Sequence, residues 1–578
     1  MKRLLVYLKG YEKESIIAPL FKMLEAFFDL MVPLVVASII NNGISQNNMT
    51  VVWQNFGLLL VLMIIGLACS VTAQYFASKA SVGFGTKLRQ ALFDHIQSLS
   101  YTELDRLGTN TLITRLTSDI NQVQTGYNLT LRLLLRSPFI VLGAMIMAFT
   151  IDVESAWIFA IAIPILSVVV FGIMLISIPL YKKVQKRLDA VLTATRENLT
   201  GVRVIRAFRK EEDEIKSFDE KNVSLTKTNS FVGRLSALMN PATYLIVNMA
   251  TILLIQKGAI RVEMGALDRG SVVALYNYMA QIIVELIKLA DLIITIDKSL
   301  ACAGRIGSVL DVKSSMQYGN RQEKDTDVSV LFDHVYFTYS GAGAESLSDI
   351  SFEAKKGQTV GIIGGTGSGK SSLVNLIARF YDASQGTVFV NGLDVKEYPE
   401  GKLLDKIGIV PQKAILFKGS VRDNLKWGKE DASDEEIWKA LEIAQAKEVV
   451  EGKQGQLDFT IEQNGRNLSG GQRQRLTIAR ALVSNPEILI MDDSASALDF
   501  ATDAALRKAI NSLQQKMTVF IVSQRTASVL SADLILVLDD GQLVGKGSHD
   551  MLMETCPIYQ EIYYSQFPEK RKEAVQNV

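Results

Sequence analysis

A glycine-rich octapeptide in the C-terminal half has the residue types needed to hold phosphate groups. It reads Gly364-Gly365-Thr366-Gly367-Ser368-Gly369-Lys370-Ser371, between an apolar run over 359–363 and a helix predicted over 371–380. Glycines let backbone N–H groups close around phosphates at a helix N-terminus, where the helix dipole favours anions. We expect this phosphate loop, together with Ser372, to bind ATP. Lys370 would reach the terminal phosphates and Ser371 would ligate Mg²⁺.

Three residues elsewhere in the chain are candidates for the same site. Asp492 ends the apolar strand predicted over 488–492 and is the expected second Mg²⁺ anchor, since Mg²⁺ prefers oxygen ligands. Gln412 carries an amide that can reach Mg²⁺ or an attacking water. Tyr339 is a candidate for stacking on adenine, with packing in the core or at a strand edge as the alternative. Tyr336 and Phe337 compete with Tyr339 for the stacking role.

A second phosphate-seeking motif follows, in the run Leu468-Ser469-Gly470-Gly471-Gln472. It opens a helix predicted through Arg475 to Leu482, so it offers another helix N-terminus to an anion. One nucleotide cannot easily sit on two such termini of the same domain. We therefore expect this signature run to contact ATP held by another copy of the domain, and this chain contains only one.

Composition separates the chain into two parts. At 578 residues it is too long for one hydrophobic core. Hydrophobic residues make up 48% and are concentrated before residue 300. The net charge of +1 argues against a nucleic-acid-binding surface, which would be strongly basic. The three cysteines have no metal-ligand spacing.

The N-terminal part is expected to cross a lipid bilayer. Apolar runs near the ~20 residues needed for one crossing lie at 16–40, 53–77, 133–150, 156–181, 242–260 and 272–296. Two long loops between them are rich in Lys and Arg, so these loops, both termini and the nucleotide domain are expected on the cytoplasmic side. The loop with Lys257, Arg261 and Arg269 fits this orientation poorly.

Two of the predicted spans carry ionisable residues at helical spacing. Such groups are costly in lipid, so they should face a water-filled cavity or partner groups. Ion pairs within each helix and direct contact with a transported molecule remain alternative interpretations. Tyr276, Asn277 and Tyr278 are equally open, with helix packing favoured. The ionisable residues are Lys22, Glu25, Asp29, Glu285, Lys288 and Asp291.

These patterns predict the domain organisation. We expect an all-α transmembrane domain of six helices over 1–308, a linker over 309–328, and an α/β nucleotide-binding domain over 329–568. A charged tail over 569–578 follows. The α/β domain should hold the phosphate loop on a strand–loop–helix unit and the signature run on an α-helical subdomain.

The order of the phosphate loop, Gln412, the signature run, Asp492 and the loop Ser496-Ala497-Leu498-Asp499 resembles the ATP-binding-cassette family. Six preceding spans with two long cytoplasmic loops resemble its half-transporter exporters. By this resemblance, the segment 197–208 belongs to the second intracellular loop. The first loop's counterpart lies around 101–119. Glu462 matches the glutamate that relays nucleotide state to these loops.

Two residues depart from the family pattern where hydrolysis is carried out. Asp493 stands where the family has a general-base glutamate, and Gln524 stands where it has a switch histidine. Asp493 is one methylene shorter, and glutamine cannot ionise near neutral pH. We expect both changes to weaken turnover while nucleotide can still bind. The pattern resembles the degenerate-site subunit of bacterial heterodimeric multidrug exporters.

This resemblance implies a multi-pass protein of the cytoplasmic membrane that exports amphipathic small molecules with a second, catalytically complete half-transporter. A homodimeric exporter with two slow sites is one alternative. An ATP-gated channel or regulatory subunit is another. An importer is disfavoured because spans and cassette are fused.

Overall fold

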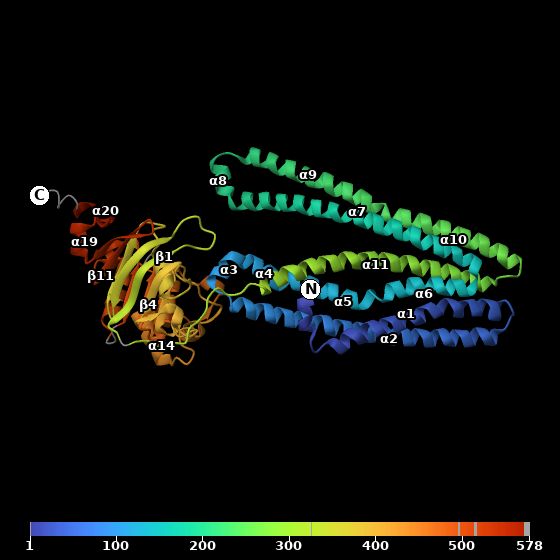
Figure 1. Cartoon of the computed structure of the whole chain (residues 1–578), viewed down its shortest axis with the longest axis horizontal. Helices are drawn as coiled ribbons and strands as arrows, with labels where there is room; N and C mark the ends of the chain where they lie inside the picture. Colours follow the sequence, from blue (N-terminus) through green and yellow to red (C-terminus); the bar gives the residue numbers. More distant parts are fainter. Residues whose placement is uncertain (1, 325, 495–496, 514–516, 571–578) are drawn as a thin grey trace. The chain divides into compact units, whose positions relative to one another are not determined.

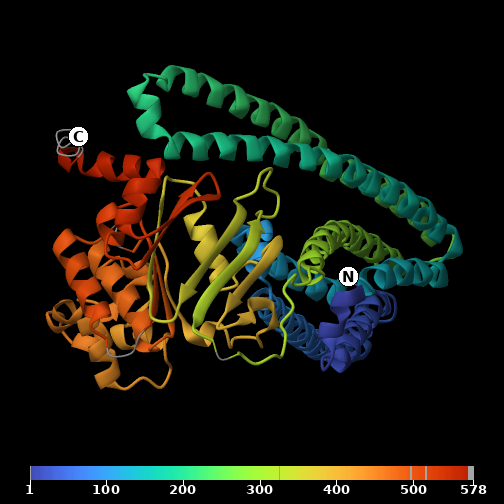
Figure 2. The same ribbon diagram turned by 60° about the vertical axis from the view of Figure 1, so that its left-hand side comes forward.

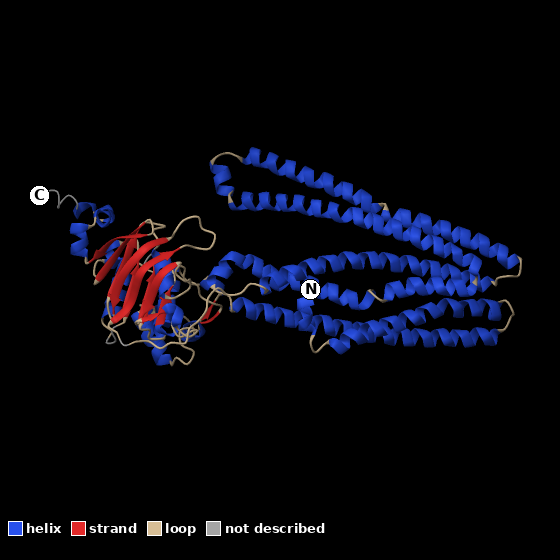
Figure 3. Ribbon diagram, in the orientation of Figure 1, coloured by secondary structure: helices blue, strands red, loops and turns tan. Residues whose placement is uncertain are grey.

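The computed structural model describes residues 2–324, 326–494, 497–513 and 517–570. The chain divides into two compact units. The first comprises 1–97 and 109–312, and the second comprises 98–108 and 313–578. All strands assigned among the described residues belong to the second unit (Figure 3).

The described part of the first unit is helical and is built mainly from long helices (Figure 1). A helix satisfies its backbone hydrogen bonds internally, which is what an apolar segment in lipid requires. The longest have 49, 48 and 42 residues, well beyond the ~20 needed to cross a bilayer. The helices are η1 Lys2–Leu8, α1 Glu12–Ser38, η2 Ile39–Ile44, α2 Met49–Gln97, α4 Thr109–Thr114, η3 Arg115–Asp119, α5 Ile120–Leu133, α6 Arg136–Ile151, α7 Val153–Thr200, α8 Val202–Ala207, α9 Glu211–Ala237, α10 Met239–Glu263 and α11 Arg269–Leu310.

Five helical stretches among the described residues are long and apolar enough to cross a membrane. They are Glu12–Ile44, Met49–Gln97, Thr109–Ile151, Val153–Thr200 and Glu211–Glu263. The sequence predicts six spans. The sixth corresponds to α11, which carries Glu285, Lys288 and Asp291 and is not among the five. The sixth span therefore stays a prediction.

Two of the predicted ionisable residues in each of α1 and α11 form an ion pair within that helix. Lys22 Nζ lies 2.6 Å from Glu25 Oε2, and Lys288 Nζ lies 2.9 Å from Glu285 Oε1. These are the intrahelical pairs that the sequence offered as one interpretation. They reduce the cost of carrying charge in an apolar segment.

A third helix adds a cation that sequence analysis missed. Arg136, at the start of α6, places Nη1 2.6 Å from Glu285 Oε1 and Nη2 3.0 Å from Asp29 Oδ2. Its guanidinium thus joins α1, α6 and α11. Asp29, Arg136 and Glu285 line a cavity of about 500 Å³, while Asp291 lines a different one. Ion pairing within single helices is therefore only part of the arrangement.

The helix-packing interpretation holds for Tyr278. Its side chain is fully buried, and its hydroxyl donates to the carbonyl oxygen of Leu30 at 2.6 Å. Tyr276 is exposed, and Asn277 lines the cavity beside Asp29. The three neighbouring residues therefore have three different environments.

The second unit is organised around a six-stranded sheet. The strand order is β12-β11-β3-β10-β9-β6, and only the pairing of β12 with β11 is antiparallel. The central strands are almost continuously buried, as expected for a parallel sheet covered on both faces. The strands are β3 Thr359–Gly364, β6 Ile407–Val410, β9 Ile488–Asp492, β10 Thr518–Val522, β11 Leu534–Asp539 and β12 Gln542–Gly547.

A second, antiparallel sheet has the order β2-β1-β4-β5, and β7 pairs with β8. Figure 2 shows the strands of this unit, with the helices of the orange part of the chain beside them. The remaining strands are β1 Val328–Phe337, β2 Leu347–Lys355, β4 Gln385–Val390, β5 Leu393–Asp394, β7 Gly419–Ser420 and β8 Thr460–Ile461. The helices are α3 Tyr101–Leu107, α12 Lys370–Ile377, η4 Val395–Glu397, η5 Leu404–Lys406, α13 Val421–Lys426, α14 Asp434–Ile443, α15 Lys447–Glu451, η6 Gln456–Asp458, η7 Gln463–Gly465, α16 Gly470–Val483, α17 Phe500–Asn511, α18 Thr526–Val529, α19 His549–Thr555 and α20 Pro557–Gln566.

Candidate nucleotide-binding site

The phosphate loop connects the end of β3 to the start of α12. Gly369, the residue before α12, has φ +93°, a left-handed conformation that favours glycine. A Cβ there would lie 2.7 Å from the carbonyl oxygen of Ser346, and a Cβ on Gly364 would overlap the carbonyl oxygen of Leu538. Glycine at these two positions therefore allows the loop to lie close to neighbouring backbone.

The helix after the loop is shorter than predicted. The sequence pattern indicated a helix over 371–380, but α12 ends at Ile377. Arg379 has φ +51°, which ends the right-handed helix. Ala378, Arg379 and Phe380 therefore form a turn.

Lys370 points its ammonium group back into the loop. Its Nζ donates to the carbonyl oxygen of Gly364 at 3.0 Å and lies 3.3 Å from Ser368 Oγ. Burial lowers the pKa of Lys370, while the negative charges of Asp493 and Asp492 oppose part of that shift. A buried cation surrounded by polar loop atoms is well placed to bind an anion.

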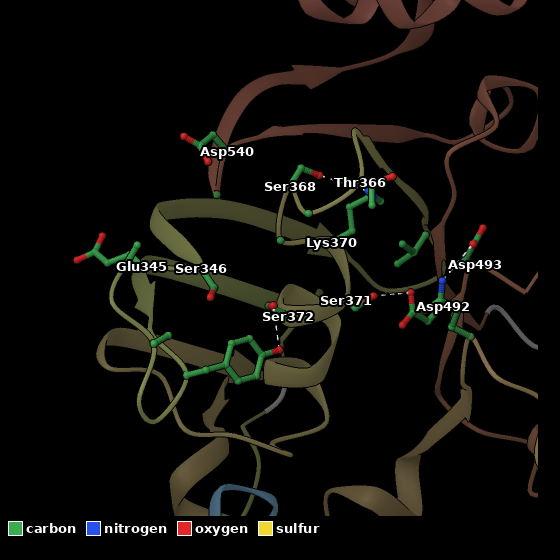
Figure 4. Close-up of a pocket in the computed structure, with 18 of the residues that line it drawn as sticks. Glu345, Ser346, Thr366, Ser368, Lys370, Ser371, Ser372, Asp492, Asp493 and Asp540 are labelled. Atoms are coloured by element: carbon green, nitrogen blue, oxygen red, sulfur yellow. Dashed lines mark hydrogen bonds between the residues drawn. The ribbon is translucent and has the colours of Figure 1, made fainter. Parts of the chain in front are cut away.

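Ser371 and Asp492 meet at the carboxyl end of the parallel sheet. Ser371 Oγ donates to Asp492 Oδ1 at 3.0 Å (Figure 4). Burial raises the pKa of Asp492. The bond from Ser371 opposes that shift, the charge of Asp493 adds to it, and Lys370 opposes it. A hydroxyl and a carboxylate oxygen at one point suit Mg²⁺, which binds few protein oxygens and completes its shell with phosphate and water.

Asp493 adopts an uncommon backbone conformation. Its φ is +47°, a left-handed value that Asp tolerates better than most residues. Its N–H donates to the carbonyl oxygen of Val522 on β10 at 3.0 Å. Its Oδ2 lies 3.5 Å from Nε2 of Gln412. The backbone thus directs this carboxylate toward the amide that the sequence proposed as a ligand of Mg²⁺ or water.

Gln524 follows β10 at the same edge of the sheet. Gln524 is exposed, and its backbone carbonyl oxygen accepts a hydrogen bond of 2.8 Å from Gln566 Nε2. Gln524 therefore presents an uncharged amide where a neighbouring strand end carries Asp492 and Asp493.

One cavity of about 600 Å³ brings most of the predicted residues together (Figure 4). The predicted site residues on its lining are Tyr339, Thr366, Gly367, Ser368, Gly369, Lys370, Ser371, Ser372, Gln412, Asp492, Asp493 and Gln524. Gly364 and Gly365 belong to the same loop but are absent from the lining.

Tyr339 differs from its two competitors in reaching this cavity. Phe337 is buried in the core of the unit, and Tyr336 lies on β1 away from the lining. The hydroxyl of Tyr339 lies 3.0 Å from Ser372 Oγ. Its ring therefore lies beside the first turn of the helix that follows the phosphate loop.

The signature run forms a well-capped helix N-terminus. Ser469 caps α16: its Oγ accepts from the N–H of Gln472 at 3.3 Å, and Gln472 Oε1 accepts from the N–H of Ser469 at 3.0 Å. Ser469 and Gly470 are exposed. None of Ser469, Gly470, Gly471 or Gln472 lines the 600 Å³ cavity described above. The N-terminus of α16 is thus exposed at Ser469 and Gly470 and separate from the lining of this cavity.

Several lining residues were missed by sequence analysis. Glu345 and Ser346 precede β2, and Asp540 and Gly541 form the turn between β11 and β12. The N–H of Ser348 donates to the carbonyl oxygen of Gly541 at 2.8 Å, which brings these segments together. A turn sequence predicts a hairpin, but not that the hairpin borders the phosphate loop.

Part of the loop after β9 lies outside the described residues, including Ser496. Of the predicted loop, Ala497, Leu498 and Asp499 are described. Asp499 caps α17, accepting from the N–H of Thr502 at 2.8 Å.

Comparison with known proteins identifies the family. Residues 15–286 match the ABC transporter transmembrane region, and residues 347–496 match the ABC transporter family. An uncharacterized ABC transporter ATP-binding protein of Bacillus subtilis is 34% identical, covering 99% of this chain and 100% of its own. The chain belongs to the ABC transporter family. This transporter is an exporter-type half-transporter, with one transmembrane region fused to one ATP-binding domain.

Two further proteins resemble this ABC transporter. A probable multidrug resistance ABC transporter ATP-binding/permease protein of Bacillus subtilis is 33% identical over 83% of this chain and 82% of its own. A solved structure of a bacterial Atm1-family ABC exporter with ATP bound has a TM-score of 0.78, covering 97% of this chain and 98% of its own. Its identity is 22%, so it establishes the fold. Membership of the ABC transporter family implies binding of ATP with Mg²⁺, and the geometry of Ser371 and Asp492 suits that pair.

Proposed function

We propose that this chain is one half of a heterodimeric ABC exporter that moves amphipathic compounds (drugs, lipids or peptides) across the cytoplasmic membrane. Its nucleotide domain and both termini would lie in the cytoplasm. Drugs as the transported compounds are supported by the name of one relative, the probable multidrug resistance ABC transporter protein of Bacillus subtilis. The heterodimer and the unequal ATP sites are supported by the residues around the phosphate loop.

The observation that carries the proposal is Asp493 beside an otherwise complete binding site. Lys370, Ser371 and Asp492 retain the groups that hold phosphate and Mg²⁺. A carboxylate shortened by one methylene is drawn back by roughly 1 Å, a displacement that can cost ~100-fold in rate. This chain's own site would therefore bind ATP and hydrolyse it slowly.

Gln524 supports the same division between binding and hydrolysis. Its amide can donate a hydrogen bond to a phosphate oxygen, but it cannot carry the charge of a protonated histidine. It lines the cavity with Asp493. ATP held between Lys370 and Gln524 would then persist over many cycles and keep the two nucleotide domains together.

The signature run supplies the argument for a partner. Its capped helix N-terminus is exposed and is not on the lining of the cavity around Lys370. A helix N-terminus favours a phosphate because its backbone N–H groups and the helix dipole both point toward the anion. We propose that Ser469, Gly470, Gly471 and Gln472 contact ATP bound by the partner, and that this contact completes the faster site.

The test is purification of the tagged full-length chain from its native membrane in mild detergent. The proposal predicts a second half-transporter in 1:1 ratio, with Glu and His at the positions equivalent to Asp493 and Gln524. Recovery of this chain as a homodimer, with ATPase activity equal to that in membranes, would contradict it.

A further inference from the structure

A four-residue segment after α12 contacts two parts of the chain that lead to the transmembrane unit. This junction segment is Arg379-Phe380-Tyr381-Asp382, and it follows the helix that begins at Lys370 of the phosphate loop. One part is α3, which lies in the chain between α2 and α4. The other is the connection that follows α11. All the contacts described below lie inside the second unit.

Tyr381 touches the aromatic residue that lines the ATP cavity. The ring centroids of Tyr381 and Tyr339 are 5.2 Å apart, with an interplanar angle of 81°. Tyr339 also packs edge-on against Phe337 at 4.6 Å, and Phe337 lies 5.6 Å from Tyr381. Edge-to-face pairs at these separations are attractive. A shift of the Tyr339 ring would therefore change its packing against the ring of Tyr381.

Tyr381 also holds α3 through its hydroxyl group. Its OH donates to Asp105 Oδ2 at 2.6 Å, a short bond to a charged acceptor. Burial raises the pKa of Tyr381, and the bond and charge of Asp105 raise it further, so the hydroxyl stays a donor. Tyr101, at the start of α3, packs against Phe380 with centroids 4.7 Å apart. Two adjacent aromatic residues of the junction segment, Phe380 and Tyr381, thus contact α3 at Tyr101 and Asp105.

Arg379 contacts the second connection. Its Nη2 donates to the carbonyl oxygen of Gln317 at 2.6 Å, and its guanidinium lies 5.1 Å from the ring centre of Tyr318. Asp382 fixes the guanidinium through a 2.9 Å bond to Nε. Arg379 is buried. The junction segment therefore binds both α3 and the chain that follows α11.

We propose that Tyr381 is a positioning residue that transmits occupancy of the adenine position at Tyr339 to α3. The inference rests on the proposed function, because it requires a nucleotide base to contact Tyr339. A base stacked on Tyr339 restricts that ring. Tyr381 packs against the ring, and its hydroxyl then holds Asp105 in one position. Loss of this hydroxyl should separate nucleotide binding from the response of α3.

Hydrogen–deuterium exchange of the full-length protein in its native complex tests the proposal. Residues 101–107 are followed with and without Mg²⁺ and a non-hydrolysable ATP analogue. In the wild type, the analogue should slow exchange in this segment. The ratio of the exchange rates without and with the analogue measures this slowing. In Tyr381→Phe that ratio should be about tenfold smaller than in the wild type, because a hydrogen bond to a charged acceptor contributes about that much. Analogue binding by fluorescence should stay within about twofold, since Tyr339 and Lys370 are unchanged.

A matched variant controls for the loss of any buried tyrosine hydroxyl. Tyr559→Phe removes a hydroxyl that lies 2.8 Å from His549 Nδ1, in the same unit and away from α3. Its exchange over 101–107 should follow the wild type. Asp105→Ala should reproduce Tyr381→Phe, and the double variant should add nothing, because both changes break one bond.

The two proposals fail in distinguishable ways. If the wild type binds the analogue and Tyr381→Phe keeps the full nucleotide-dependent slowing, the role of Tyr381 is wrong and the proposed function stands. The role of Tyr381 is also wrong if the wild type binds the analogue without any change over 101–107. If the wild-type complex neither binds the analogue nor hydrolyses ATP, the proposed function fails and the inference fails with it.

Discussion

The hydroxyl of Ser371 lies 3.0 Å from the carboxylate of Asp492, although 121 residues separate them in the chain. The contact exists because β3 and β9 run in the same direction, each paired with β10 between them. Parallel strands end at one edge of their sheet, so residues that follow them converge there. The Mg²⁺ ligands proposed for this transporter thus depend on the strand order.

Asp492→Asn should make the nucleotide-free protein more stable at pH 7. Burial raises the pKa of Asp492, so its ionised form is disfavoured in the folded state. Stability from such a group is fully present below the unfolded pKa and is lost as pH rises through the folded pKa. Thermal denaturation without nucleotide measures the effect. A lower melting temperature for the variant at pH 7 would contradict this account.

The same raised pKa predicts a pH dependence of Mg²⁺-dependent binding. Asp492 must be ionised to serve as a ligand. Because its pKa is raised, Mg·ATP affinity should begin to fall at a higher pH than for an ordinary aspartate. Titration of Mg·ATP across the acidic range measures this, with ATP in EDTA as the control. Equal pH profiles with and without Mg²⁺ would show that Asp492 does not hold the ion.

Tyr339→Ala should weaken ATP binding, whereas Tyr336→Ala should not. Stacking of a base on an aromatic ring contributes ~1–3 kcal/mol, which corresponds to about 5- to 150-fold in Kd. Tyr336 is a matched control, since it precedes Tyr339 by three residues and is absent from the cavity lining. Equilibrium binding to the purified complex provides the measurement. Equal losses in the two variants would assign Tyr339 to packing.

Arg136→Met should destabilise the transmembrane unit. Its guanidinium bridges Glu285 and Asp29, and the side chains of Arg136 and Glu285 are only 12% and 4% exposed. Removing one partner of a buried ion pair costs ~3–5 kcal/mol. Lys210→Ala is the control, because Lys210 and Asp213 are 63% and 70% exposed and such pairs contribute ~0–1 kcal/mol. Thermal unfolding in detergent should therefore show a lower midpoint for Arg136→Met than for the control.

Asp493→Glu should speed hydrolysis at this chain's own site. The measurement uses a complex whose partner has its general-base glutamate replaced by glutamine, so that only this site contributes. Recovering roughly 1 Å of reach should raise the ATPase rate by about tenfold or more. Adding Gln524→His should raise it further. If both variants stay at the background rate while binding ATP normally, the slow site has another cause.

Much of the nucleotide domain follows from short-range patterns. The phosphate loop requires glycines at fixed positions. The buried strand before it and the helix after it are its neighbours in the sequence, so local patterns predict all three. Asp493 and Gln524 were identifiable as departures from a family pattern. Asp540 and Gly541 could not be identified as residues of the site, because the sequence of a hairpin turn does not indicate which loop the turn packs against.

The ionic arrangement in the transmembrane unit shows the same limit. Lys22 with Glu25 and Glu285 with Lys288 are separated by three residues, so helical periodicity predicts those pairs. Arg136 reaches two other helices, a contact set by packing rather than by spacing. The junction between Tyr381 and Asp105 is likewise a tertiary contact, across 276 residues of sequence.

The central claim is that this chain binds one ATP and helps its partner hydrolyse another. Steady-state ATPase activity of the intact complex tests it with Ser469→Ala and Asp493→Asn. Ser433→Ala, which removes the same kind of helix cap from α14, controls for lost stability. Ser469→Ala should lower activity by about 100-fold, the usual loss for a donor to the reacting group, and Asp493→Asn by less than about twofold. An Asp493→Asn loss as large as that of Ser469→Ala would contradict the account.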